Sequence, residues 1–272
     1  MRNLIYLFAR YGAQIMFVSL QAICFYLIVN FNKEQQEIFI NSSNLFSGYI
    51  SEKSQTVRDY FKLKQVNDSL MQHNARLLEE IINRADPSYT FHEIDSNYQQ
   101  FLVTPATICE KTIHLRNNNY TLCIGKAHGV QRNMGVITEK GVVGITRNVS
   151  ANYSLVIPLN SMLSRLSCSF KKNNFHGILT WKDTDSFTMK LEGVPKHADI
   201  AIGDSIVTSG FSFIFPKGIP VGVVSNFFVN PGSAFYTIDV TIHNDLNRIS
   251  YVYVIRNQRR EEIEDLKSEI TQ

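Results

Sequence analysis

The feature that most constrains this chain is an uncharged stretch near its amino terminus. No Asp, Glu, Lys or Arg occurs from Tyr11 to Asn32. As a helix that rises about 1.5 Å per residue, this stretch would be about 33 Å long, which matches the apolar core of a bilayer. It is longer than the apolar part of a usual secretion signal, and no cleavage-site pattern of small residues lies near its end. We therefore expect residues 11–32 to form one uncleaved transmembrane helix.

Charged residues on the two sides of this stretch predict its orientation. Arg2 and Arg10 precede it together with the free amino group, whereas Lys33 follows it beside acidic residues. Because positive charge is enriched on the cytoplasmic side of a membrane span, residues 1–10 are expected in the cytoplasm. Nearly everything after the span would then lie on the other side of the membrane.

A helical repeat of apolar residues follows the uncharged stretch. Its members recur at spacings of three, four and once seven residues, as in the seam of a coiled coil. The expected seam and dimerisation residues are Leu63, Val66, Leu70, Leu77 and Ile81. We expect residues 45–84 to form a coiled-coil helix that joins copies of the chain. The alternative is an amphipathic helix that lies on its own domain.

The helical pattern ends before Pro87, since proline cannot continue a helical hydrogen-bond ladder. Residues 85–100 are expected to be a linker. Beyond them, short runs rich in Val, Ile, Thr, Phe and Tyr alternate with Gly, Asn, Asp and Pro, which is typical of antiparallel β structure. The clearest run extends from Tyr236 to His243, where apolar residues occupy every second position.

The predicted fold class is therefore mainly β: a transmembrane helix, a coiled-coil helix and two small antiparallel β-barrels. We expect the first barrel over residues 101–162 and the second over residues 163–256. Residues 257–272 are charged and are expected to form a tail.

Charge and cysteine content exclude several function classes. The chain has 27 Lys and Arg against 24 Asp and Glu, a net charge of +3, so a nucleic-acid partner is not expected. The four cysteines include no C-x-x-C pair of the kind that binds zinc. Cys109 and Cys123 could form a disulfide if the compartment is oxidising, and the sequence leaves that pairing open.

Motifs for catalysis are tempting but incomplete. The chain order His128, then Asp183 or Asp199, then Ser205 is that of a chymotrypsin-like protease. Ser205, however, runs straight into a strand-like segment. Ser169 and Lys172 match S-x-x-K, but the other motifs of penicillin-binding enzymes are missing. Neither H-E-x-x-H nor a glycine-rich phosphate loop occurs in the sequence. No catalytic residue, metal ligand or cofactor is therefore expected.

Two linked segments resemble a known family. Gly203-Asp-Ser-Ile-Val-Thr-Ser-Gly210 is similar to G-D-x-V-x-T-S-G, and Phe215-Pro-Lys-Gly-Ile-Pro-Val-Gly222 is similar to F-P-x-G-[IL]-x-V-G. Both patterns, and the order of span, coil and β region, resemble the rod shape-determining protein MreC family up to about Ile255. The signature residues are Gly203, Asp204, Thr208, Ser209, Gly210, Pro216, Gly218 and Gly222.

These signature residues are of types that shape backbone. Pro216 and Gly218 suit a turn, Pro220 suits the first residue of a strand, and Gly222 suggests a bulge or bend within it. The neighbouring Phe211, Phe213 and Phe215 could line a binding surface or fill the core, and the core is the favoured expectation. The motif would thus hold a barrel that presents a binding surface.

The resemblance implies a non-enzymatic scaffold in the periplasm, anchored in the bacterial inner membrane by a single pass. It also implies partners: the elongation-specific penicillin-binding transpeptidase, the membrane protein MreD, the actin-like MreB and a second copy of the chain. The alternative function is a periplasmic adaptor of an efflux or secretion pump. A membrane-anchored protease ranks third.

Overall fold

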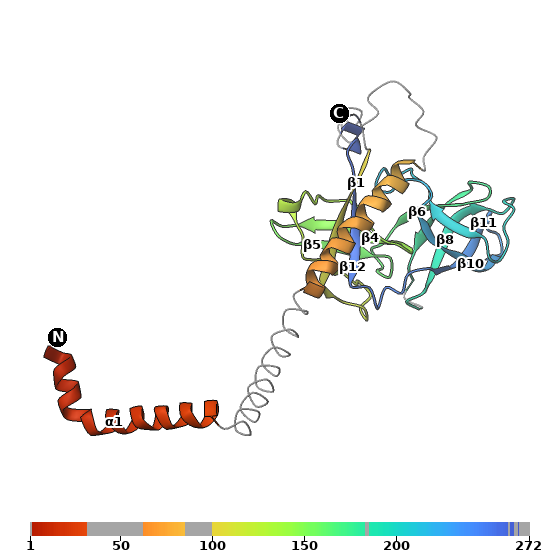
Figure 1. Ribbon diagram of the computed structural model, residues 1–272. Coiled ribbons are helices and arrows are strands. Elements are labelled where there is room, and N and C mark those ends of the chain that lie inside the picture. Colours follow the sequence, from red (N-terminus) through yellow and green to blue (C-terminus); the bar gives the residue numbers. More distant parts are fainter. Residues whose placement is uncertain are drawn as a thin grey trace. The chain divides into compact units, whose positions relative to one another are not determined.

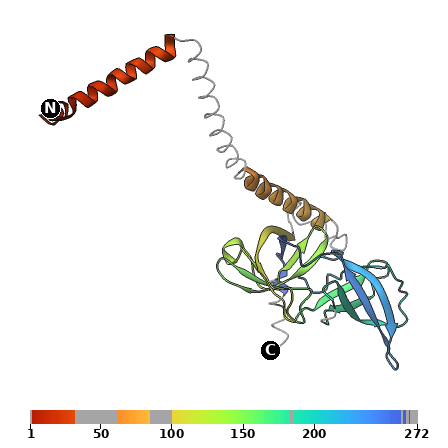
Figure 2. The same cartoon turned by 90° about the horizontal axis from the view of Figure 1, so that it is seen from below.

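The computed structural model describes residues 2–31, 62–84, 100–182, 185–260, 262, 263 and 266. Within them, the chain forms two α-helices and two closed antiparallel barrels of six strands each (Figure 1, Figure 2). Met1–Asp68 and Ser69–Gln272 are separate units. The predicted mainly β fold with two barrels is confirmed. The predicted linker lies almost wholly outside the described residues.

The first unit contains helix α1 (Arg2–Phe31), which covers nearly all of the uncharged stretch. Large apolar side chains of this helix, such as Met16 and Phe25, are exposed. In the part of the chain that the structure describes, no helix combines the length and the apolar character needed to cross a membrane. The transmembrane assignment of residues 11–32 stays a prediction.

The first barrel is closed by strands from both ends of the second unit. Its strands are β1 (Phe101–Lys111), β2 (Tyr120–Leu122), β3 (Gly135–Thr138), β4 (Gly141–Val149), β5 (Ser154–Pro158) and β12 (Tyr251–Asn257), in the spatial order β1-β12-β3-β4-β5-β2. The short 3-10 helix η2 (Lys126–His128) follows β2. Side chains such as Tyr120, Val136 and Val254 fill the interior. Burial of each valine side chain contributes roughly 1.5–3 kcal/mol to the stability of the fold.

Strand β12 corrects the predicted domain boundary. The sequence assigned residues 163–256 to the second barrel, but β12 pairs with β1 from Phe101↔Asn257 to Thr107↔Tyr251 and also pairs with β3. The blue β12 accordingly lies beside the yellow β1 (Figure 1). The second barrel is therefore an insertion between β5 and β12. Without β12 the first barrel would have open edges on β1 and β3, which a closed barrel avoids.

The second barrel consists of six strands that follow one another in sequence. They are β6 (Leu166–Phe170), β7 (His176–Thr180), β8 (Thr188–Pro195), β9 (Ser205–Thr208), β10 (Pro220–Val229) and β11 (Phe235–Ile242), in the spatial order β10-β11-β8-β7-β6-β9. The expected alternation in β11 is confirmed, since Ile238, Val240 and Ile242 are buried. Strands β7 and β8 form an antiparallel hairpin.

Candidate functional site

The helix at residues 62–84 carries the predicted seam on its exposed side. All five seam residues are exposed, with fractions between 45% for Leu77 and 71% for Leu63. Apolar side chains at three- and four-residue spacings form one stripe along a helix. The structure therefore leaves an uncovered apolar stripe, here called the seam, which consists of Leu63, Val66, Leu70, Leu77 and Ile81.

The opposite side of the same helix packs on the first barrel. Ala75 and Ile82 are buried, and Leu78 packs against the hydrophobic core. At roughly 100° per residue, these positions lie away from the seam. Residues 69–84 accordingly lie beside the first barrel in both views (Figure 1, Figure 2). One face of the helix thus lies on its own domain, which is the alternative that the sequence had left open, and the seam on the other face is exposed.

Polar side chains fix this packing at the edge of β1. Asn83 Nδ2 donates to the carbonyl of Phe101 at 2.9 Å, and the Phe101 N–H donates to Asn83 Oδ1 at 3.0 Å. The Val103 N–H donates to Glu79 Oε2 at 2.8 Å. Because β1 pairs with β2 only from Ile108 onward, its first half would otherwise present unpaired backbone groups. This contact was not predicted from the sequence. The feature that could have indicated it is the pair of polar residues Glu79 and Asn83, which lie four positions apart on the helix.

Thr208 holds the loop between β9 and β10 closed. Its Oγ1 donates to the Pro216 carbonyl at 2.6 Å and accepts from the Ile219 N–H at 3.0 Å. Its backbone N–H donates to the Ile219 carbonyl at 2.9 Å. Gly210 and Gly218 lie at the two ends of the loop with φ of 81° and 94°, a region that favours glycine. The signature is therefore a set of residues that shape one loop.

Other signature residues tie neighbouring segments to β9. Asp204 accepts a hydrogen bond from the Ala201 N–H at 2.7 Å and forms an ion pair with Lys172 at 2.9 Å. The hydrogen bond to Asp204 is the largest cause that raises the pKa of Lys172 above its ordinary value. Desolvation opposes it, and the hydrogen bond to Asp199 and the charges of both carboxylates add to the rise. The Ser209 and Ser167 hydroxyls are 2.8 Å apart, which links the end of β9 to β6. Gly203 turns the chain with φ of 91°.

Gly222 lies where a side chain does not fit. A β-carbon at this position would lie 2.3 Å from the Thr241 carbonyl oxygen on β11. The pairing of β10 with β9 also shifts register between Pro220 and Gly222. The expected bulge and the placement of Pro220 as the first residue of its strand are both confirmed.

Phe215 joins the two barrels. Its side chain is 2% exposed and lies over Gly135 of β3, where an added β-carbon would be 2.5 Å from the Phe215 ring. Asn244 Nδ2 donates to the carbonyls of Gly141 and Val142 in β4 at 2.9 and 3.0 Å, which also bridges the barrels. The signature loop is thus part of a fixed junction between barrels.

The core prediction for the three phenylalanines holds only for Phe215. Phe211 is 61% exposed and stacks edge-on against His176, and Phe213 is only partly buried. The loop reverses direction between Gly210 and Gly218, so alternating positions within it do not share one face as they would in a strand.

The residues of the tempting catalytic patterns are not assembled. His128 ends η2 in the first barrel, whereas Ser205 begins β9 in the second. Ser169 is fully buried in β6, while Lys172 is exposed and paired with Asp204. Among the described residues, no group of three or more His, Cys, Asp or Glu is placed to hold a metal ion.

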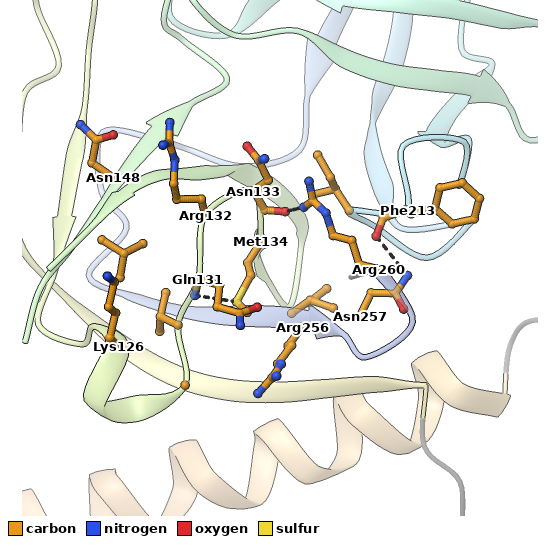
Figure 3. A pocket seen from close by; sticks show the side chains of 15 residues that line it. Lys126, Gln131, Arg132, Asn133, Met134, Asn148, Phe213, Arg256, Asn257 and Arg260 are labelled. Atoms are coloured by element: carbon orange, nitrogen blue, oxygen red, sulfur yellow. Dashed lines mark hydrogen bonds between the residues drawn. The ribbon is translucent and has the colours of Figure 1, made fainter. Parts of the chain in front are cut away.

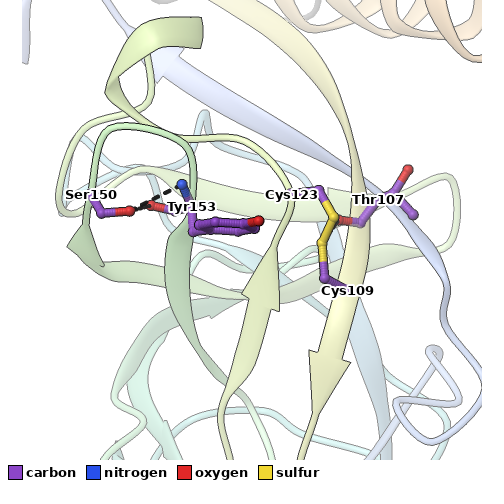
Figure 4. Close-up of a disulfide and its surroundings, with 5 residues drawn as sticks. All are labelled: Thr107, Cys109, Cys123, Ser150 and Tyr153. Atoms are coloured by element: carbon purple, nitrogen blue, oxygen red, sulfur yellow. Dashed lines mark hydrogen bonds between the residues drawn. A yellow bond between two sulfur atoms is a disulfide. The ribbon is translucent and has the colours of Figure 1, made fainter.

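Cys109 and Cys123 form a disulfide, which the sequence had left open. Their Cα atoms are 5.7 Å apart, and the bond links β1 to the residue that follows β2 (Figure 4). Cys168 is buried in β6, and burial raises the pKa of its thiol. A protonated, buried thiol is a poor nucleophile, so Cys168 is a core residue.

Comparisons with known proteins agree with this architecture. The family model described as rod shape-determining protein MreC, barrel core, matches residues 108–256. The cell shape-determining protein MreC of Escherichia coli K12 is 32% identical over 132 residues, which are 48% of this chain and 35% of that protein. That of Cereibacter sphaeroides is 27% identical over 202 residues, which are 74% of this chain and 61% of that protein. The chain thus spans less than two thirds of these relatives.

A solved structure shows the same fold. MreC of Listeria monocytogenes superposes with a TM-score of 0.57 at 22% identity, and the match covers 72% of this chain and 94% of the other. At this identity the likeness concerns the fold alone. The family match covers more than half of the 272 residues and includes strands of both barrels. The chain therefore belongs to the rod shape-determining protein MreC family.

Proposed function

We propose that this protein is a scaffold of the cell-wall elongation machinery and is required for cell shape. The observation that carries the proposal is the match of residues 108–256 to the MreC barrel core, a family whose relatives are named cell shape-determining proteins. Buried hydrophobic side chains occupy the interiors of the two barrels, so their outer surfaces and the helix remain for recognition. A scaffold needs such surfaces and does not need an active site.

The proposed location is the bacterial inner membrane, with the barrels in the periplasm. Three features support it: the uncharged residues 11–32 within and beside α1, the two arginines before them, and the Cys109–Cys123 disulfide. Disulfides persist in oxidising compartments and are rare in the cytoplasm. The amino terminus would be cytoplasmic and the chain would cross the membrane once.

The proposed oligomer is a dimer joined through the seam. An isolated apolar stripe on a helix gains stability when a second helix covers it. The helix is already held on the barrel by its other face, through Asn83 and Glu79. This arrangement would place two copies with their barrels on the outer sides of a shared helix pair.

The proposed partners follow from the family resemblance. They are the elongation-specific penicillin-binding transpeptidase, the membrane protein MreD and the actin-like MreB. A pump adaptor, the alternative function, is not supported, since the relatives are cell shape-determining proteins.

Depletion of the protein from its own bacterium tests the role. Cells should lose their normal length-to-width ratio and become rounder, and the wild-type chain should restore it. The seam variant Leu70→Asp/Leu77→Asp should not restore shape, whereas Ser69→Asp/Arg76→Asp, which alters exposed residues one position away, should do so. Unchanged shape on depletion would contradict the proposal.

A further inference from the structure

A groove of about 940 Å³ lies beside the junction of the two barrels. The first barrel lines it with Lys126 and residues 129–134 and 148–149 (Figure 3). Residues 255–257 and Arg260 at the end of β12 and residues 213–214 of the loop between β9 and β10 complete the lining. Pockets for small ligands commonly measure about 300–1,000 Å³, so this groove has room for several residues of a peptide. Neither the scaffold proposal nor the family match assigns it a role.

The lining of this groove carries positive charge only. Lys126, Arg132, Arg256 and Arg260 contribute cationic groups, and no Asp or Glu is among the described residues that line it. The Arg260 guanidinium donates to the Asn133 carbonyl, which holds it at the rim. The side chains of Lys126, Arg132 and Arg256 make no hydrogen bond or ion pair with the described part of the chain. A concave surface lined by one sign of charge concentrates its field and attracts the opposite charge.

Residues with an unusual backbone conformation also line this groove. In the described residues, non-glycine residues with positive φ are Asn133, Asn174 and Phe213, and two of these three line the groove. Phe213 has φ of 53°, a rare conformation for an aromatic residue. Asn257 Nδ2 donates to its carbonyl at 3.0 Å and so holds it in place. Strained residues that their surroundings hold in place are concentrated at binding sites.

We propose that this groove binds an acidic peptide segment. Guanidinium groups pair with carboxylates through two parallel hydrogen bonds, and three of the four cations are arginines. Arg256 and Arg260 are only partly exposed, so an inserted chain can reach them more readily than a flat membrane surface can. The protein itself carries a segment of this chemistry, Glu261-Glu-Ile-Glu-Asp265, which a second copy could supply. The inference does not depend on the proposed role in cell shape, because it concerns direct binding.

The test uses the full chain in detergent micelles and a fluorescent peptide of the sequence of residues 261–272. Anisotropy should show saturable binding that weakens about tenfold or more when ionic strength rises from about 0.05 to 0.5 M, because salt screens charge pairs. A chain that ends at Arg260 removes competition from its own acidic residues and should bind at least as well. Absence of binding to both chains would overturn the proposal.

Two charge reversals locate the site. Lys126→Glu/Arg132→Glu should weaken peptide binding by about tenfold or more, since both side chains are exposed and line the groove. Arg147→Glu is the matched control, because Arg147 is an exposed residue of the same barrel that does not line the groove. It should change affinity by less than about twofold. Equal losses of peptide affinity in the two variants would mean that the attraction is non-specific, and would contradict the proposed binding site.

The peptide chemistry is tested with an uncharged version. Replacement of each Glu by Gln and of Asp265 by Asn should abolish binding, and equal binding of this peptide would contradict recognition of carboxylates. Displacement of the acidic peptide by an equal concentration of inorganic pyrophosphate would reassign the groove to phosphate ligands. Unchanged melting temperatures of the variants show that lost binding does not reflect unfolding.

Discussion

The side-chain amide of Asn83 pairs with the backbone of Phe101 in both directions, as a neighbouring strand would. One hydrogen bond runs from Nδ2 to the Phe101 carbonyl and the other from the Phe101 N–H to Oδ1. Glu79 extends the same contact to Val103. A helix thus covers the part of the β1 edge that β2 does not reach, which protects it from pairing with another chain.

Asn83→Ala should therefore destabilise the first barrel. It leaves the N–H and carbonyl groups of Phe101 without these partners in a partly buried place, at a cost of about 1–3 kcal/mol. Gln72→Ala is the matched control, because Gln72 is an exposed amide of the same helix that lies outside the seam. Urea unfolding of a fragment of residues 32–272 measures the free energy of unfolding of both variants. Equal stability of the two variants would show that the contact contributes nothing.

Gly222 is expected to tolerate no side chain. Gly222→Ala already places a β-carbon 2.3 Å from the Thr241 oxygen, and Gly222→Val adds further crowding. We expect a graded loss of about 1 to several kcal/mol, because backbone atoms of both strands must shift. Thermal unfolding followed by circular dichroism checks this. A melting temperature of Gly222→Val within about one degree of the wild type would mark the position as ordinary strand.

Local patterns were predictable from the sequence, and long-range pairing was not. Alternation in β11 and the bulge at Gly222 depend on neighbouring residues, so the sequence indicates them directly. Strand β12 looks like any other strand, and only its pairing with β1 at the far end of the domain assigns it to the first barrel. Phe211 and Phe215 are of the same type, yet the loop between β9 and β10 buries only the second.

For the helix at residues 62–84, the sequence predicted only one of the two faces. Its apolar spacing predicted the seam, but the face that packs on the barrel relies on Glu79 and Asn83, which an apolar pattern ignores. The basic groove was missed for a similar reason. Lys126 and Arg132 are far from Arg256 in sequence, and they meet it only because the segment after β2 and strand β12 belong to the same barrel.

Thiol reactivity should follow the disulfide and the burial of Cys168. In a Cys24→Ser background, the folded oxidised protein should not react with a maleimide. Mild reduction should expose Cys109 and Cys123, and Cys168 should react only after denaturation. Burial raises the pKa of Cys168, so less thiolate forms at any given pH below that pKa. Mass spectrometry counts the labels, and labelling of Cys168 in the folded protein would contradict its placement in the core.

Labelling from outside should reveal the orientation of the chain. Single cysteines at Asn3 and Gln36, in a background without native thiols, lie before and after the predicted span of residues 11–32. An impermeant reagent applied to intact spheroplasts should label position 36 and spare position 3, because Arg2 and Arg10 favour the cytoplasmic side. Lysed spheroplasts provide the control, in which both positions should react. The reverse pattern in intact spheroplasts would invert the proposed topology.

The seam should hold the dimer together. A fragment of residues 32–272 is expected to sediment as a dimer at micromolar concentration, because the five exposed apolar residues need a partner and the opposite face already packs on the barrel. Leu70→Asp/Leu77→Asp places uncompensated charges in that seam, at a cost of several kcal/mol per site in an apolar environment. This variant should be a folded monomer.

Two point substitutions test the seam more cleanly than removal of the helix. Truncation would also uncover the β1 edge that Asn83 and Glu79 cover, so an aggregated fragment would say nothing about the seam. Ser69→Asp/Arg76→Asp is the matched control, since these exposed residues have the same spacing one position away. It should stay dimeric. Equilibrium ultracentrifugation with far-ultraviolet circular dichroism separates dissociation from unfolding, and a dimer that persists in Leu70→Asp/Leu77→Asp would move the interface to the barrels.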